Sequence, residues 1–120
     1  EKATAYAAER RAFGKAINEF QSLQFKLADM ATNLEAARVM LYAAASAYDR
    51  QDPQTTMRCA MAKRFASDTG SQIVDEALQI FGGYGLAKEF VIEKMYRDAR
   101  ASMIEDGVNE ALALKATEYW

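Results

Sequence analysis

The sequence contains no histidine, and this absence excludes several kinds of catalytic site. Ser-His-Asp and Cys-His nucleophilic sites both need an imidazole. The di-iron sites of helical bundles also need one, because some of their ligands come from Glu-x-x-His pairs. Acid-base chemistry in this chain must therefore come from carboxylates, lysine, tyrosine or an organic cofactor.

Cysteine is nearly absent as well, since Cys59 is the only one. An internal disulfide is excluded, and we expect a reducing intracellular compartment, either the bacterial cytoplasm or the mitochondrial matrix of a eukaryote. We expect Cys59 itself to be a small core residue. No apolar run approaches the roughly eighteen residues of a membrane span, so we expect neither membrane insertion nor a secretion leader. Because the chain opens in mid-pattern at Glu1, we expect it to be a piece of a longer polypeptide.

Dense clusters of basic residues are also missing. The 15 basic and 17 acidic residues give a net charge of -2 and are spread along the chain, so nucleic acid is not an expected partner. A hydrophobic content of 51% in 120 residues is enough for one globular domain with a core.

The clearest positive pattern is a stripe of apolar residues at alternating spacings of four and three. This spacing places the whole stripe on one face of a long helix, which we expect to end near Pro53. The members of the stripe are Leu23, Leu27, Met30, Leu34, Ala37, Leu41, Ala44 and Tyr48.

A second stripe predicts another long helix that ends at a group of glycines. Gly70 lies inside this helix, where it costs about 1 kcal/mol relative to alanine, so we expect a close helix-helix approach there. The members of this stripe are Met61, Phe65, Thr69, Ile73, Ala77 and Ile80.

Shorter helices are expected around this central pair, over residues 1–13, 89–102 and 109–119, the first of them stopped by Gly14. No alternating pattern predicts a strand. The predicted fold is therefore all-α, an antiparallel up-and-down four-helix bundle with short flanking helices.

Four segments in order go beyond a generic bundle: RRAFGKAINEFQ (10–21), LADMAT (27–32), QIFGGYG (79–85) and EKMYRDAR (93–100). With these motifs the chain resembles the C-terminal helical domain of the acyl-CoA dehydrogenases, flavoenzymes that desaturate acyl-CoA thioesters. The resemblance runs from about Ala3 to Leu114. It implies that an N-terminal helical domain and a middle β domain are absent here. It further implies an FAD cofactor, an acyl-CoA substrate, a homodimer or homotetramer, and an electron-transfer flavoprotein as a possible acceptor.

The glycines of QIFGGYG have two interpretations. An isolated glycine at this position would be a helix C-cap followed by a turn. The resemblance implies instead that the segment meets the FAD of a neighbouring subunit near its pyrophosphate and adenosine, where glycine lets backbone N–H groups come close to phosphate oxygens. The residues in question are Gln79, Ile80, Phe81, Gly82 and Gly83.

The RRAFGK segment could simply place arginine at the C-terminal end of a helix dipole. By the resemblance, Arg10 and the backbone of Arg11 and Ala12 contact the FAD diphosphate, for which the arginine fork is well suited. Further contacts with the cofactor are implied for Phe13, Phe20 and Gln21.

A third segment, YRDAR, is expected to be structural. Arg97, Asp98 and Arg100 suggest a network of ion pairs near a helix end.

The sequence departs from the family at its catalytic position. The family commonly reads Ile-Tyr-Glu-Gly-Thr there, and its Glu removes the α-proton of the acyl group, whereas residues 104–108 read Ile-Glu-Asp-Gly-Val. Alignment on Gly107, where substrate contact is implied, makes Asp106 the candidate base. Asp is one methylene shorter than Glu, and a displacement of about 1 Å can cost on the order of 100-fold in rate.

Several interpretations of this departure remain open. Asp106 is the base in a repositioned loop that suits a bulky or cyclic acyl group, or the base lies on an upstream helix, or the protein does not perform ordinary α,β-dehydrogenation. From the residues alone, Glu105 and Asp106 would be acidic capping residues of a last helix that begins near Gly107.

The residues after this glycine carry the last implied cofactor contacts. Val108, Asn109 and Glu110 are implied to lie near the ribityl and pyrophosphate part of FAD. The usual hydroxyl is missing at Val108, and Asn109 or backbone groups could replace it. The leading hypothesis is thus an FAD-dependent acyl-CoA dehydrogenase, inactive as this isolated domain. The alternative is a non-catalytic helical assembly domain.

Overall fold

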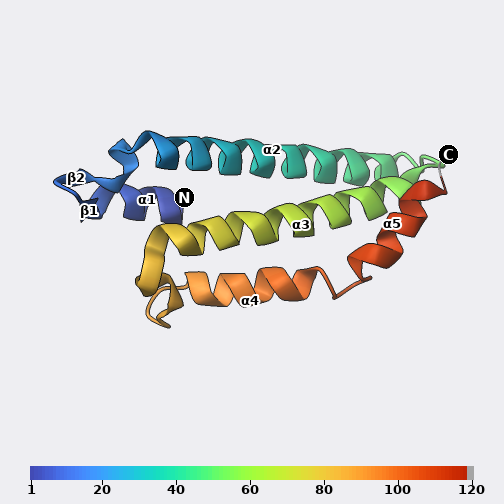
Figure 1. The fold of residues 1–120 in the computed structure, drawn as a ribbon. Helices are drawn as coiled ribbons and strands as arrows, with labels where there is room; N and C mark the ends of the chain where they lie inside the picture. The colour runs from blue at the N-terminus through green and yellow to red at the C-terminus, as the bar shows by residue number, and fades with distance from the viewer. Residues whose placement is uncertain (119–120) are drawn as a thin grey trace.

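The computed structural model describes residues 1–118, which fold as an elongated group of helices (Figure 1). Two long helices form the centre, and shorter helices flank them. The elements are α1 (Lys2–Glu9), β1 (Arg11–Ala12), β2 (Lys15–Ala16), a 3-10 turn (Ile17–Glu19), α2 (Gln21–Asp49), α3 (Thr55–Phe81), a second 3-10 turn (Gly82–Leu86), α4 (Ile92–Ser102) and α5 (Asn109–Thr117).

The predicted all-α antiparallel fold is confirmed. α3 is the central element, because it contacts α1, α2, α4 and α5. Figure 1 shows α2 and α4 running along opposite sides of α3, with α5 at the end near the α2–α3 connection. The helix predicted over 109–119 is observed as Asn109–Thr117, and Tyr119 lies outside the described residues. Within residues 1–118, no helix combines the length and the apolar character that crossing a membrane requires.

The connection between α2 and α3 explains why both helices end where they do. Asp52 accepts a hydrogen bond from the backbone N–H of Gln54 at 2.8 Å, and its carbonyl accepts one from the Thr55 hydroxyl at 2.6 Å. Pro53 lies between these contacts, where a missing N–H costs nothing. The turn therefore begins α3 one residue after Gln54, as the single proline predicted.

A compact core lies at the end of the bundle where α1 packs against α3. The Tyr6 and Phe81 rings stack with their centroids 4.2 Å apart, and Phe90 meets Phe81 edge-on at 5.7 Å. Buried neighbours on α1, α3 and α4 complete the cluster: Ala3, Ala7, Ala77, Ile80 and Ile92.

The apolar stripe of α2 is only half covered within the chain. Its alanines, Ala37 and Ala44, are buried against the neighbouring helix, whereas Leu34, Leu41 and Tyr48 are 49%, 54% and 71% exposed. The helices pack through small residues, so the larger side chains of the stripe remain on the surface. We call the exposed set Leu34, Leu41 and Tyr48 the uncovered stripe.

The first predicted helix is wrong in extent. α1 ends at Glu9, and residues 11–16 form a two-stranded antiparallel hairpin that pairs Arg11 with Ala16 and Ala12 with Lys15. Phe13 and Gly14 form its two-residue turn with φ values of 53° and 85°. Consecutive positive φ values match the right-handed twist of a hairpin. Gly14 therefore closes a hairpin turn and does not stop a helix.

Two further expectations concerning α3 are wrong. Cys59 is exposed rather than a core residue. At Gly70, an added Cβ would meet nothing within 4 Å, so no helix approaches closely enough to require glycine. The chain therefore carries the cost of a helical glycine without a packing benefit among the described residues.

Replacing Gly70 with alanine is expected to stabilise the chain by about 0.5–1 kcal/mol, because alanine loses less backbone entropy in a helix and the methyl group has room. Urea unfolding of both forms measures the difference. A loss of stability would show that something packs against this face of α3. Gly83→Ala is a useful comparison, because Gly83 also has no close neighbour but lies outside the long helices.

The ion-pair network predicted among Arg97, Asp98 and Arg100 is wrong, because among residues 1–118 none of these residues pairs with another of the three. Arg97 donates from Nε to Glu93 Oε2 at 3.0 Å, and Asp98 pairs with Lys94. The hydrogen bond from Arg97 holds the pKa of Glu93 below its ordinary value, and this bond raises the pKa of Arg97. Arg100 instead donates to the sulfur of Met103 at 3.6 Å. Each ion pair spans four residues of α4, so the pairs support this helix locally.

Candidate functional site

Arg10 and Ile17, the residues on either side of the hairpin, line one hollow together with the glycine-rich turn, although about seventy residues separate them in sequence. The hollow has a volume of about 480 Å³. The guanidinium of Arg10 lies over the Tyr84 ring, 5.7 Å from its centroid. The lining residues are Tyr6, Arg10, Ile17, Ile80, Phe81, Gly82, Gly83 and Tyr84. We call this space the Arg10 hollow.

The three glycines of the turn serve different purposes. Gly82 has a φ of 59° and a ψ of -141°, close to a region that only glycine populates freely. A Cβ on Gly83 would meet nothing within 4 Å, so its backbone has open space in front of it. A Cβ on Gly85 would lie 3.0 Å from the Leu78 carbonyl oxygen and from the Phe81 Cβ. Gly82 thus shapes the turn, Gly83 leaves it open, and Gly85 packs inside the chain.

The other predicted residues at this end surround the hairpin. Phe13 is 96% exposed at its tip, with Phe20 edge-on at 6.2 Å. Arg11 donates to the carbonyl oxygen of Gly14 at 3.2 Å, so its side chain is used within the hairpin, while Ala12 is partly buried. Gln21 and Gln79 are exposed, whereas Ile80 and Phe81 are 8% and 7% exposed and belong to the core.

The turn between α4 and α5 has an unusual backbone. Asp106 and Gly107 have φ values of 53° and 100°, so both lie in the left-handed region. Aspartate tolerates this conformation better than most side chains do. A Cβ on Gly107 would lie 3.3 Å from Leu112 Cδ2. We call residues 105–108 the acidic turn.

The capping interpretation of Glu105 and Asp106 is wrong. α5 begins at Asn109 with Val108 as its N-cap, and no side chain caps it. Within residues 1–118, no hydrogen bond or ion pair involves the carboxylate of either acid. The position of the acidic turn therefore leaves the Asp106 carboxylate available for contacts outside the helices.

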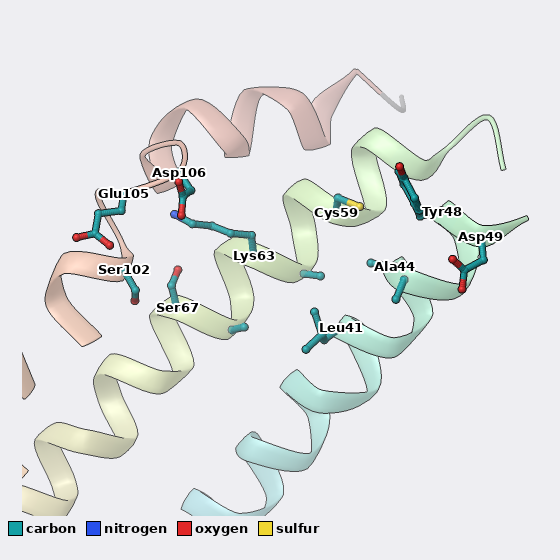
Figure 2. Close-up of a pocket in the computed structure, with 13 residues that line it drawn as sticks. Leu41, Ala44, Tyr48, Asp49, Cys59, Lys63, Ser67, Ser102, Glu105 and Asp106 are labelled. Carbon is teal, nitrogen blue, oxygen red and sulfur yellow. The ribbon is translucent and has the colours of Figure 1, made fainter. Parts of the chain in front are cut away.

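A second, larger hollow opens beside the acidic turn (Figure 2). Its volume is about 670 Å³, and its walls come from the C-terminal half of α2 and the N-terminal half of α3. Leu41 and Tyr48 of the uncovered stripe lie on one wall, and Glu105 and Asp106 close the other side with Lys63 and Ser67. The arrangement places carboxylates at the edge of a largely apolar space, and we call it the Asp106 hollow.

Asn109 is fixed inside the protein between α3 and α5. It is 5% exposed, and its Oδ1 accepts a hydrogen bond from Lys63 Nζ at 3.0 Å while its Nδ2 donates to Asp68 Oδ1 at 2.8 Å. Lysine can only donate and ionised aspartate can only accept, so the amide has one possible orientation. Ser67 also accepts from Nδ2, at 2.9 Å. The side chain of Asn109 is therefore occupied within the chain, whereas Val108 and Glu110 are exposed beside it.

The sequence reasoning missed Lys63, Ser67 and Asp68. Lys63 also donates to the carbonyl oxygen of Gly107 at 2.6 Å, across 44 positions of the chain. The available signal was a pair of polar residues four apart on a helix rich in apolar residues. That signal alone does not say which segment the polar residues contact.

The two hollows lie far apart. Gly82 follows Lys63 by nineteen residues, and at about 1.5 Å per residue this is roughly 28 Å along α3. Lys63 touches the acidic turn, so the turn and Gly82 are separated by about this distance. The structure brings Arg10 and Gly82 together, but it does not bring Gly82 near Asp106.

Comparison with known proteins identifies the family. Residues 1–118 match the model of the acyl-CoA dehydrogenase C-terminal domain. The chain belongs to the acyl-CoA dehydrogenase family. The resemblance seen in the four motifs is therefore confirmed.

Similar proteins include two that are named for CoA thioesters. The chain is 46% identical over 110 residues to subunit CarC of the caffeyl-CoA reductase-Etf complex of Acetobacterium woodii. The matched region covers 92% of this chain and 29% of that protein. It is 45% identical over 112 residues to benzylmalonyl-CoA dehydrogenase of Aromatoleum aromaticum, covering 93% and 29%.

Butyryl-CoA dehydrogenase of Megasphaera elsdenii has the same fold, with a TM-score of 0.94 and 41% identity over 98% of this chain and 30% of that one. The acyl-CoA dehydrogenase domain described here thus spans under a third of the length of these relatives.

Proposed function

We propose that the chain is the C-terminal domain of an FAD-dependent acyl-CoA dehydrogenase that desaturates an acyl-CoA thioester between its α and β carbons. The relatives are about three times as long. The longer enzyme would add the N-terminal helical domain and the middle β domain that the family resemblance implies. The observation that carries the proposal is the acidic turn, where a carboxylate with no partner among residues 1–118 borders a hollow of about 670 Å³. The family membership supports it independently.

Asp106 is the proposed base. Its carboxylate would take the α-proton of the acyl group, and the hydride from the β-carbon would pass to FAD. The side chain is exposed in this chain, so the rest of the enzyme and the substrate would have to exclude water from it. Apolar walls such as Leu41 and Ala44 are suited to that exclusion.

The Arg10 hollow fits part of an FAD molecule. Arg10 supplies a cation that can donate two parallel hydrogen bonds to a diphosphate. The open backbone at Gly83 offers an approach without a side chain in the way. The hairpin presents Phe13 and the backbone of Arg11 and Ala12 at the same end. These residues, with Phe20, Gln21 and Gln79, would hold the cofactor.

The separation of the two hollows supports a site shared between two copies. The acidic turn and Gly82 lie roughly 28 Å apart, so the residues around them cannot both touch the same diphosphate. An FAD held near Val108 and Glu110 of one copy would need Arg10 and Gly82 from another. The uncovered stripe offers apolar surface for such a homodimer or homotetramer.

The partners follow from the same assignment. We propose acyl-CoA thioesters as substrates, including ones with a ring, because two similar proteins are named for caffeyl-CoA and benzylmalonyl-CoA. An electron-transfer flavoprotein is the proposed acceptor, since one relative is a subunit of a complex with Etf. The proposed location is the bacterial cytoplasm or the mitochondrial matrix.

The first experiment is to purify the full-length protein and record its visible absorbance. We expect a yellow protein with a flavin band, or a colourless one that becomes yellow when FAD is added. A protein that stays colourless after reconstitution would overturn the proposal. It would favour the helical assembly domain, for which the uncovered stripe is the supporting observation.

Replacing Arg10 with alanine is expected to weaken FAD binding on the order of 10- to 100-fold, because a charge-assisted pair of hydrogen bonds to the diphosphate is lost. Titration of apoprotein with FAD, followed by fluorescence quenching, measures this. Arg11→Ala is the matched control, since the Arg11 side chain bonds within the hairpin and only its backbone is assigned to FAD. If Arg10→Ala and Arg11→Ala weaken FAD binding equally, the assignment of the Arg10 side chain to the FAD diphosphate is wrong.

A further inference from the structure

The acidic turn is held to α3 by a single lysine. Among residues 1–118, Lys63 is the one side chain that hydrogen-bonds to the backbone of residues 104–108, through Nζ to the Gly107 carbonyl at 2.6 Å. The backbone hydrogen bonds in and around the turn are local: Ile104 and Glu105 donate to Ala101, Leu112 donates to Val108, and Asn109 donates across the turn to Met103. Lys63 is therefore the direct side-chain link from α3 to the backbone of the turn, while Asn109, which follows the turn, is anchored separately to Ser67 and Asp68.

The turn needs such a link because Asp106, a non-glycine residue, has a positive φ. Asp106 and Gly107 follow each other in the left-handed region. A non-glycine residue there persists only when the surroundings fix it. The Leu112 side chain lies close to Gly107, and Lys63 donates a hydrogen bond to the Gly107 carbonyl.

The lysine is itself fixed by one further contact. Its Nζ donates to Asn109 Oδ1 at 3.0 Å, and Asn109 is buried and held in turn by Ser67 and Asp68. All three α3 residues lie within two turns of that helix. Figure 2 shows the amine of Lys63 reaching the turn that carries Asp106. The position of the turn is thus set by a chain of hydrogen bonds that starts on α3.

We infer that Lys63 is a positioning residue, which sets the place of the Asp106 carboxylate by holding the Gly107 carbonyl. This inference rests on the proposed function of Asp106 as the base. It bears on the length of the aspartate side chain, which is one methylene shorter than the glutamate common in the family. A carboxylate on a shorter stem needs a turn that is fixed in a compensating position, because a displacement of about 1 Å can cost on the order of 100-fold in rate.

The test replaces Lys63 with methionine in the full-length, FAD-loaded enzyme. Methionine keeps an unbranched stem of similar length and removes the donor. Rapid mixing with acyl-CoA without oxygen should show flavin reduction slowed on the order of 10- to 100-fold, with acyl-CoA affinity and flavin content within about threefold of wild type. The matched control is Lys26→Met, which removes a lysine that also bridges to α3, through Glu76, but lies far from the turn. The control should keep the wild-type reduction rate.

A double-mutant cycle separates positioning from a general structural effect. If Lys63 acts through Asp106, then Lys63→Met should slow the residual reaction of Asp106→Asn by less than about threefold. An equal slowing in both backgrounds would overturn the inference, and so would a wild-type rate in Lys63→Met. If Lys63→Met does not fold, Lys63→Gln removes the charge and the reach of lysine while keeping a polar group, and the same criteria apply to it.

A second readout does not depend on activity. Amide hydrogen exchange of residues 104–109 should be at least about tenfold faster in Lys63→Met than in wild type and unchanged in Lys26→Met. Unchanged exchange in both variants would overturn the inference. If wild-type flavin is reduced by no acyl-CoA, the proposed function fails, while faster exchange would still support the role of Lys63 in holding the turn.

Discussion

Replacing Asp106 with asparagine is expected to slow reduction of the flavin by acyl-CoA on the order of 100- to 10,000-fold, which is the range of a lost general base. Asparagine has nearly the same shape and size as aspartate, so the turn should keep its backbone. It cannot accept the α-proton, and no other group in the turn is proposed to replace it. Anaerobic rapid mixing with the best acyl-CoA measures the rate directly.

Glu105→Gln is the matched control for this change. Glu105 borders the same hollow and carries the same charge, so a general electrostatic effect would appear in both variants. We expect Glu105→Gln to remain within about fivefold of wild type. Normal reduction of the flavin in Asp106→Asn would mean that the base lies on an upstream segment. A larger loss in Glu105→Gln would move the role to Glu105.

Replacing Phe81 with alanine is expected to lower the free energy of unfolding of the chain by about 3–5 kcal/mol. Phe81 is 7% exposed, stacks on Tyr6 and meets Phe90 edge-on, so its removal leaves a cavity at the centre of the α1–α3 core. A domain of this size has a stability of roughly 5–15 kcal/mol, so the loss is a large fraction of the total. Urea unfolding followed by circular dichroism measures it.

Phe13→Ala provides the control, because it removes the same side chain from a site that is 96% exposed. We expect its unfolding free energy to change by less than about 0.5 kcal/mol. Similar losses at both positions would contradict the placement of the core. The comparison also tests the hairpin, since a helical Phe13 facing the core would not be neutral.

The sequence was sufficient to predict α2 and α3 but not the hairpin before them. Stripes with spacings of three and four define long helices well, because many residues repeat one signal. Strands of two residues cannot show a period, so the sequence predicts a helix that continues from residues 1–9 through Arg10 to Phe13. The positive φ values of Phe13 and Gly14 then give Gly14 a different role from the one predicted.

The candidate site was predictable where it depends on local motifs. The motif around Gly82 does form a turn with open backbone. Gly85, in contrast, is needed for packing inside the chain and not for the approach of a cofactor. At Gly70 the sequence predicts a close helix-helix approach that the structure does not contain among the described residues. A glycine in a helix does not by itself reveal what lies beside it. The position of Asp106 came from alignment on Gly107, and the cofactor roles of these residues stay predictions.

The contact between Lys63 and Gly107 could not be predicted from one sequence. It joins residues 44 positions apart, and its geometry depends on how α5 and the acidic turn fold back onto α3. The same holds for Asn109, whose burial between Lys63 and Asp68 arises only in the packed structure. Local patterns specify elements, whereas contacts between distant elements need their arrangement in space.

Anaerobic titration of the full-length yellow protein with acyl-CoA thioesters tests the central claim most directly. The panel should include straight-chain, cyclic and aryl-substituted acyl groups, with the flavin band recorded after each addition. We expect at least one thioester to bleach the flavin band of the wild-type protein. In Asp106→Asn, the same thioester should leave the band unbleached within the time that the wild-type protein needs. A flavin that dithionite bleaches but no thioester reduces would contradict the assignment of this domain to an acyl-CoA dehydrogenase reaction.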